Sequence, residues 1–357
     1  MGPQRWRIER IVDAGRREIS ARRVDARLHA PTSAPHLRIA PPPLPLREPI
    51  ELVVLDLPQT GDTASAHQPQ VAAFARPWPG AAALYRASGA DNHVFESLIE
   101  RPATMGALTA ELPAAAPHRW MGGGKLRVRL FGGALASREP ESVLRGANMA
   151  AIEAAPGVWE VLQFVDAELI GPAEYRLDRL LRGQAGTDPF IGAPTPAGAR
   201  FVLLDAALKR LDVDAAEIGL ATRYRIGPSH LPISDPAFRA VTMTPQAVGL
   251  RPYAPAHLNA VRDGVGDVAL AWVRRTREGG DVWGVVEPPL AEESERYRVR
   301  IMQGGAVARS IDTTAPQMLY TAAMRAADGV VGPFTVSVAQ LSAAFGPGPE
   351  TRITIDG

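Results

Sequence analysis

The chain has 357 residues, 46% hydrophobic and 22% charged, a composition that argues against disorder and favours two or three folded domains. Its 39 basic and 38 acidic residues almost cancel, so no overall field attracts nucleic acid or an anionic membrane. The lack of cysteine excludes disulfides, thiolate metal sites and cysteine nucleophiles, and 33 glycines with 33 prolines favour short strands over helical bundles.

The first predicted element is a β-hairpin within residues 1–30. Trp6 and Ile8 alternate with polar residues, a glycine-containing turn follows, and a second run carries Ile19. This alternation places Ile11 on the face opposite Trp6 and Ile8. The predicted apolar face therefore consists of Trp6, Ile8 and Ile19.

A proline-rich linker is predicted over residues 31–49, where seven of nineteen residues are proline. A two-stranded hairpin is marginally stable alone in water, so its apolar face needs a partner. Either a later part of this chain or another chain could supply it. Because the linker can extend over tens of ångströms, we expect another chain to bury Trp6.

Residues 50–256 are predicted to form a β-rich domain with short helices. Two helices are expected at Glu141–Ala147 and Glu174–Leu181, the second because Leu177, Leu180 and Leu181 would share one helical face. The predicted strands are Glu51–Leu57, Val71–Ala75, Ala82–Arg86, His93–Ile99, Leu108–Leu112, Lys125–Phe131, Val158–Val165, Phe201–Leu204, Ala221–Ile226 and Arg239–Thr242.

Residues 257–357 are predicted to form a separate β-sandwich, with Pro252 and Pro255 at its boundary. About seven short strands over a hundred residues are typical of immunoglobulin-like domains. The predicted strands are Asp267–Thr276, Arg296–Met302, Ala306–Ser310, Met318–Ala322, Phe334–Ser342 and Thr351–Ile355. The fold class of the whole chain is therefore mainly β.

Motifs of catalysis are largely missing from the sequence. The run ending in Lys125 lacks the first glycine and the final Ser or Thr of a phosphate-binding loop, and no zinc-protease or nucleophile-elbow motif occurs. Asp212 and Asp214 have a spacing that divalent metals use, but Asp214 would equally cap a helix that follows it. We expect no catalytic residue, no metal and no cofactor, although the two carboxylates of a glycosidase would leave no motif.

Three tryptophans in loop contexts are candidate contacts for a ligand or receptor: Trp78, Trp120 and Trp283. Loops carry binding residues more often than cores do, and aromatic rings stack on sugars. The alternative is that each ring fills an apolar cluster under its own loop.

No run approaches 18 apolar residues, and the first residues lack the apolar segment of a signal peptide, so no transmembrane segment is expected.

The C-terminal region resembles a fibronectin type III domain. Trp272 fits the buried tryptophan of an early strand, Tyr297–Ile301 fits the following central strand, and Phe334–Gln340 fits the penultimate strand. Phe334 stands where this family normally has tyrosine, so the resemblance implies that the hydrogen bond of the tyrosine corner is lost.

Two longer strings resemble the C-terminal part of the large tail-tip, or host-specificity ("megatron"), protein of gene transfer agents and related siphophages. One is Tyr175–Thr187; the other runs from Arg274-Arg275-Thr276-Arg277 through Gly280-Asp281 and Trp283 to Pro289–Tyr297. The family's proteins are several times longer, so the resemblance implies a split gene or a fragment whose hairpin completes a hub domain.

The resemblance implies a virion protein of the tail tip, made in the cytoplasm of a bacterial host. Three copies would surround the tail axis, contact hub and distal tail proteins and the rest of the tail-tip protein, attach to a host receptor or glycan, and help open the tail for DNA release. No sequence-specific nucleic-acid binding is expected. A carbohydrate-binding surface protein and a cell-wall hydrolase remain as alternatives.

Overall fold

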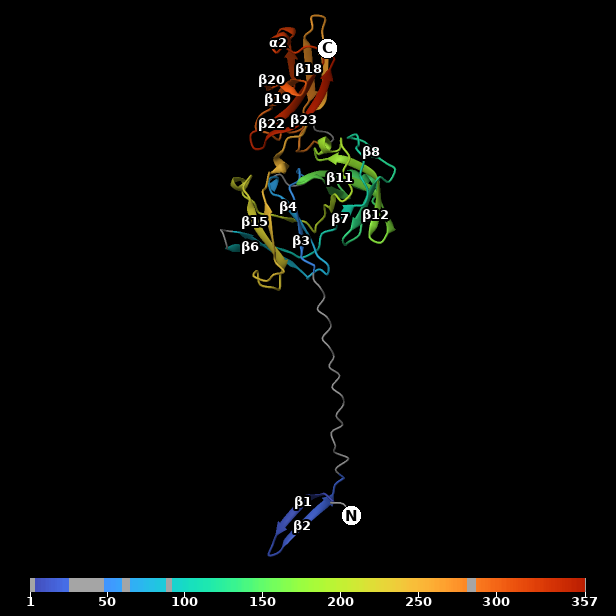
Figure 1. Cartoon of the computed structure of the whole chain (residues 1–357), viewed down its shortest axis with the longest axis vertical. Helices are drawn as coiled ribbons and strands as arrows, with labels where there is room; N and C mark the ends of the chain where they lie inside the picture. The colour runs from blue at the N-terminus through green and yellow to red at the C-terminus, as the bar shows by residue number, and fades with distance from the viewer. Residues whose placement is uncertain (1–3, 26–47, 60–64, 88–91, 281–286, 357) are drawn as a thin grey trace. The chain divides into compact units, whose positions relative to one another are not determined.

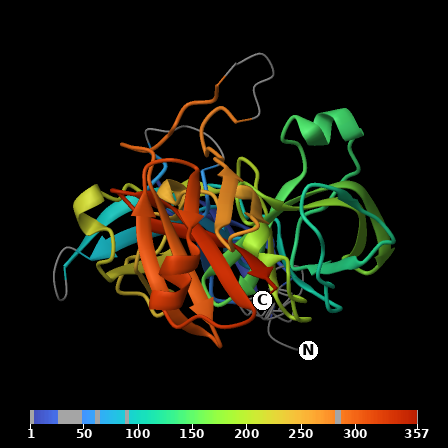
Figure 2. The same ribbon diagram turned by 90° about the horizontal axis from the view of Figure 1, so that it is seen from above.

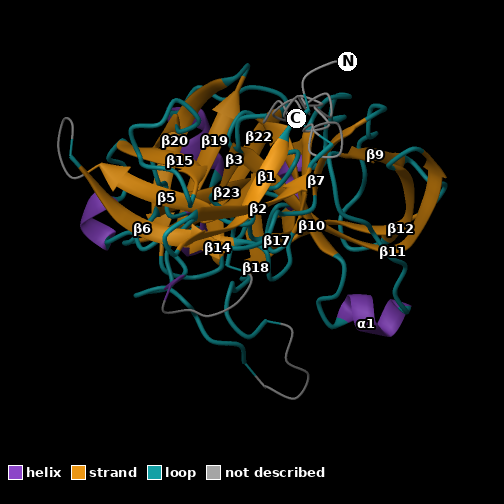
Figure 3. Cartoon of the chain, turned by 90° about the horizontal axis from the view of Figure 1, so that it is seen from below, coloured by secondary structure: helices purple, strands orange, loops and turns teal. Residues whose placement is uncertain are grey.

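The computed structural model describes residues 4–25, 48–59, 65–87, 92–280 and 287–356. It divides into two compact units, Met1–Leu46 and Arg47–Gly357 (Figure 1). Strands dominate both, which confirms the mainly β fold class (Figure 3). The linker lies almost entirely outside the described residues.

The first unit contains the predicted hairpin, formed by β1 (Trp6–Asp13) and β2 (Arg17–Arg23). A register shift between Ile8 and Arg10 places Ile11 directly opposite Ile19, so the predicted side for Ile11 is wrong. The extra residue moves it onto the face of Trp6 and Ile8. These four apolar side chains are each 53–56% exposed.

A closed β-barrel is the largest element of the second unit. Pairing of β11 with β12 closes a sheet whose order is β11-β10-β13-β7-β9-β12, and the short β8 pairs with β12 outside this ring. Buried aliphatic and aromatic side chains fill the interior. The barrel strands are β7 (Met105–Leu108), β9 (Leu126–Leu130), β10 (Met149–Ala155), β11 (Val158–Gly171), β12 (Glu174–Gln184) and β13 (Arg200–Leu203), with β8 at Trp120–Met121.

The helix predicted at Glu174–Leu181 is wrong, because this segment is strand β12. Tyr175 and Leu177 point into the barrel with the spacing of a strand. Arg179 then adopts a positive φ of 49°, which breaks the alternation and returns Leu180 to the interior. The inward residues Leu177 and Leu180 are therefore three positions apart, a spacing that is typical of a helix and explains the wrong prediction.

Other predictions for this region are partly confirmed. Helix α1 (Pro140–Leu144) overlaps the range predicted as helical, Glu141–Ala147, and lies beside β11 (Figure 3). The strand predicted at Leu108–Leu112 occurs earlier, as β7, with Leu112 making a single bridge to Thr195. Strands β8 and β10 have no counterpart among the predicted elements.

Two further sheets form layers beside the barrel. The middle layer has the order β14-β4-β3 and the outer layer β16-β15-β5-β6. Val53 and Leu55 pack toward the barrel, whereas Val71 and Ala73 pack toward the outer layer, so the middle sheet is apolar on both faces. The strands are β3 (Glu51–Leu55), β4 (Gln70–Phe74), β5 (Ala82–Ala87), β6 (His93–Ile99), β14 (Lys209–Arg210), β15 (Thr222–Pro228) and β16 (Arg239–Met243).

The barrel is inserted into these layers. It follows β6 and precedes β14, which returns to pair with β4, while β15 pairs with β5. Its first and last strands are neighbours, since Met105 lies opposite Val202. The insertion therefore begins and ends at one place on the barrel.

The C-terminal part is a β-sandwich, as predicted (Figures 1 and 2). Trp272, at 4% exposure, lies in its core with Tyr297. Phe334 is buried against the ring of Tyr320 at a centroid distance of 5.7 Å. One sheet consists of β17 (Ala256–Arg262), β18 (Val268–Val273) and β21 (Gln317–Tyr320), and the other of β20 (Ala306–Thr313), β19 (Tyr297–Gln303), β22 (Phe334–Ser342) and β23 (Gly346–Ile355). Helix α2 (Ala322–Ala327) follows β21. Of these strands, β17 has no counterpart among the predicted elements.

Candidate functional site

The two strings that carry the tail-tip resemblance meet at the junction between barrel and sandwich. The first string forms β12 and the turn after it, and the second begins after β18. Arg275 Nη1 lies 2.9 Å from Asp188 Oδ1, directly beyond the end of the first string. We call the residues joined here, from 182–190, 251–255 and 274–278, the junction.

The turn after β12 needs glycine because the backbone approaches other segments closely. Gly186 has a φ of +74°, and a Cβ placed on it would lie 2.2 Å from the ring of Tyr253. Thr187 is fully buried and its Oγ1 donates to the carbonyl of Gln184 at 2.7 Å. The same Oγ1 accepts from the N–H of Val161 at 3.0 Å, which ties the turn to β11.

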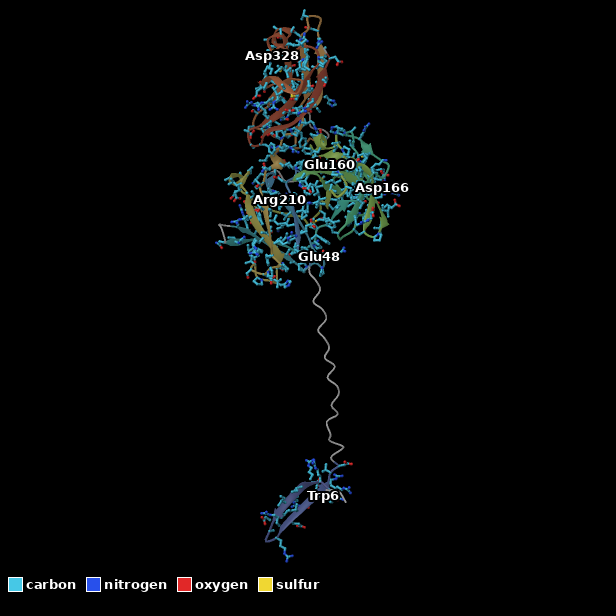
Figure 4. The ribbon with its side chains drawn as sticks, viewed as in Figure 1. Trp6, Glu48, Glu160, Asp166, Arg210 and Asp328 are labelled. Atoms are coloured by element: carbon cyan, nitrogen blue, oxygen red, sulfur yellow. The ribbon has the colours of Figure 1, made fainter. Side chains whose placement is uncertain are left out.

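A buried ion pair lies inside the barrel beside this turn. The side chains of Glu160 on β11 and Arg182 on β12 are both 0% exposed (Figure 4 labels Glu160). Arg182 donates through Nε and Nη2 to both oxygens of Glu160, the Nη2 bond being 2.7 Å, and through Nη1 to the carbonyl of Pro113 at 3.1 Å. The N–H of Gly183 adds a further bond to Glu160 at 3.3 Å. The carboxylate is thus fully engaged and shielded from water, which suits a fixed structural role.

Arginines stack on aromatic rings across the junction. The guanidinium of Arg251 lies 5.1 Å from the ring centroid of Phe190, and that of Arg275 lies 5.2 Å from the centroid of Tyr253. Burial lowers the pKa of Arg251 below its usual value, and the nearby Asp56 partly opposes this shift. Burial likewise raises the pKa of Asp56, against the backbone hydrogen bonds that stabilise its charge.

Arg277 holds the loop between β18 and β19. Its guanidinium is 3.2 Å from Glu292 and 3.1 Å from Glu278, and it donates to the carbonyl of Ala291. A further bond of 3.2 Å reaches Gln59, which lies in the segment after β3. The side chain of Glu292 is 2% exposed, and burial raises its pKa. The junction is therefore a set of paired charges and stacked rings that joins three parts of the unit.

The candidate tryptophans do not come together at this junction. Trp78 is half-buried against the core between the middle and outer layers, and its Nε1 donates to the carbonyls of Gly80 and Glu100. Trp120 is 42% exposed on β8, opposite Leu181 of β12. Trp283 lies outside the described residues. Their role as ligand contacts remains a prediction.

The candidate metal residues have other partners. Asp212 Oδ1 accepts from Gln68 Nε2 at 3.1 Å, and Asp214 occupies the N-cap of the 3₁₀ helix Ala215–Glu217. Among the residues that the structure describes, no cluster of three or more His, Asp or Glu side chains is suited to hold a metal ion. None of the described helices is both long and apolar enough to cross a membrane.

The junction is only partly visible in the sequence. Its two strings stand out by their resemblance, but the pairing of Arg275 with Asp188 joins residues 87 positions apart and has no local signal. Glu160 and Arg182 escape sequence reasoning because each stands among apolar residues of a strand. The one clue is a charged residue within an apolar stretch of a strand, which requires a partner on a neighbouring strand.

Comparison with known proteins gives one family match. Residues 103–202 match the family model described as Rcc01698-like, C-terminal, a family associated with gene transfer agents. This segment covers nearly all of the barrel, from just before β7 to Val202 in β13. No curated protein matches the chain.

Similarity to solved structures is weak. Domains d3–d4 of the rat CD45 extracellular region are 11% identical, with a TM-score of 0.24, over 43% of this chain and 72% of that one. The FN1–FN3 domains of chicken CNTN1 are 12% identical, with a TM-score of 0.21, over 86% of this chain and 98% of that one. Scores this low carry no argument about function. What the comparisons support is a relation of the barrel to a gene-transfer-agent family.

The close contact at Gly186 gives a testable expectation. Gly186→Ala should lower stability by about 2–4 kcal/mol, because it combines a strained positive φ with a clash against Tyr253. Gly198→Ala is the matched control, since Gly198 has a φ of +86° but open space around its Cβ position. Scanning calorimetry of the two variants would measure the difference. Equal losses would show that the contact with Tyr253 contributes nothing.

Proposed function

We propose that the chain is a structural component of the tail tip of a phage or gene transfer agent, with a part in host attachment and in opening the tail for DNA delivery. The observation that carries this proposal is the family match, which covers nearly all of the barrel. The ion pair of Arg275 with Asp188 suits it, because it joins the sandwich to the barrel and pairs both charges with each other.

We further propose that the chain acts without catalysis and in an assembly. Three copies would surround the tail axis, in contact with hub and distal tail proteins and with the rest of the tail-tip protein. The hairpin supports an assembled state, since its four apolar side chains are exposed.

Immunogold labelling of purified particles tests the location. Antibodies against the sandwich should label one end of the tail, at the tip. Antibodies against a capsid protein serve as the control for intact particles. Labelling confined to the host cell surface, or no copurification with particles, would contradict the proposal.

The hairpin provides a second expected result. Amides of residues 5–25 should exchange rapidly in the isolated chain, because a lone two-stranded hairpin is marginally stable, and slowly in the assembled particle. Strand β18, which is central in its sheet, should be protected in both samples and serves as the internal control. Strong protection of the hairpin in the isolated chain would show that no other chain is needed to cover it.

A further inference from the structure

The outward face of the sheet β20-β19-β22-β23 carries a row of arginines. Arg298 and Arg300 alternate with buried residues on β19, and Arg352 lies on β23. Between them, β22 presents Ser337 opposite both Arg300 and Arg352. Because this middle residue is small, long side chains from β19 and β23 can meet across β22.

Each carboxylate on this face is shared by two arginines. Glu350 lies 2.8 Å from Arg300 and 2.9 Å from Arg352, so it bridges β19 and β23. Asp312 lies 2.9 Å from Arg298 and 3.3 Å from Arg296. Four guanidinium groups against two carboxylates leave a net charge of +2 on this face.

The pairs leave most of the arginine donors for a ligand. A guanidinium has five N–H donors in a planar fork, and the contacts of each arginine with a carboxylate use one or two of them. The hydrogen bond from Arg298 also keeps the pKa of Asp312 below its usual value, so this ion pair persists into mildly acidic conditions.

A trough of about 540 Å³ lies over these arginines. Its floor includes Ala339, and one wall is the rigid segment Pro347-Gly348-Pro349. A Cβ on Gly348 would lie 2.7 Å from the carbonyl oxygen of Pro252, so this wall is pressed against the connector before the sandwich. The trough is lined by Pro189, Arg298, Arg300, Ala339, Pro347, Gly348, Pro349, Glu350 and Arg352.

We propose that this trough binds an acidic polysaccharide through its carboxylate or sulfate groups. Arginine forks match such groups in geometry as well as in charge. No aromatic ring lines the trough among the described residues, so it offers no stacking platform for single-stranded nucleic acid. Its lining on the edge strand β23 includes Pro347 and Pro349, which have no N–H to donate, so this part of the edge is poorly suited to pair with an added peptide strand.

The trough is lined by residues of the sandwich and by Pro189. Binding there can be tested on the chain alone, so its outcome does not depend on the tail-tip proposal. The experiment measures binding of the full chain to immobilised polygalacturonate and dextran sulfate, with neutral dextran as the blank. The variant Arg300→Gln/Arg352→Gln should bind both acidic polymers at least tenfold more weakly. Its melting temperature should stay close to that of the natural chain, because surface ion pairs contribute little stability.

Two controls make the result specific. Arg7→Gln/Arg22→Gln removes a cross-strand arginine pair from the hairpin, a separate unit, and should leave binding within twofold. Arg300→Lys/Arg352→Lys keeps the charge but removes the forks, and should bind more weakly than the natural chain. Unchanged binding by the glutamine variant, a larger loss in the hairpin variant, or tighter binding of single-stranded DNA at the same arginines would overturn the proposal.

Discussion

Replacing Arg182 by methionine should lower the stability of the barrel by about 3–5 kcal/mol. The reason is that Glu160, whose side chain is 0% exposed, would be left in the interior without the guanidinium that pairs with it. Hydrogen exchange of β11 and β12 as a function of urea measures this loss locally, without assuming that the whole chain unfolds in one step.

Two comparisons isolate the buried pair. Arg176→Met removes an exposed ion pair with Glu168, which also joins β12 to β11, and should lower stability by less than about 1 kcal/mol. Glu160→Leu combined with Arg182→Met should recover part of the stability, because it removes the unpaired carboxyl group while Gly183 and Pro113 still lose a partner. If Arg182→Met costs no more than Arg176→Met, the pair does not hold the barrel.

Trp272→Ala should destabilise the sandwich by about 3–5 kcal/mol through the cavity that it leaves. Trp272 is 4% exposed, and its ring meets that of Tyr297 edge-on at a centroid distance of 5.2 Å. Val273→Ala, at a neighbouring position that is 52% exposed, is the matched control and should stay within about 0.5 kcal/mol. Protection of β19 and β22 amides reports the effect. A loss confined to β17, with β19 and β22 unchanged, would mean that Trp272 does not connect the two sheets.

Regular alternation makes most strands predictable. In β9, Leu126, Val128 and Leu130 are buried and the arginines between them are exposed, as the pattern requires. Trp272 is likewise identifiable as a core residue from its place in an apolar strand. These predictions depend on neighbours in the sequence, which is the information that a single chain contains.

Irregular positions are not predictable in the same way. The positive φ of Arg179 and the register shift beside Ile8 each move later side chains to the other face, so a period-two pattern misplaces them. The ion pairs Glu160–Arg182 and Asp188–Arg275 join separate segments, and nothing local selects the partner. The junction can therefore be suspected from its two strings but not assembled from them.

The insertion of the barrel between β6 and β14 affects the order in which the layers can form during synthesis. About a hundred residues, which take roughly 5–20 s to translate, separate the strands of the middle and outer layers from their returning partners. In that interval β3 and β4 have two apolar faces, and only β5 and β6 are available to cover one of them. Within the barrel, β10, β11 and β12 pair with consecutive strands. The outer face of the barrel supplies Trp159, Val161 and Val202 as a cover for the other side. We therefore expect the layers to form outward from the barrel, with the sheet of β15 and β16 added last.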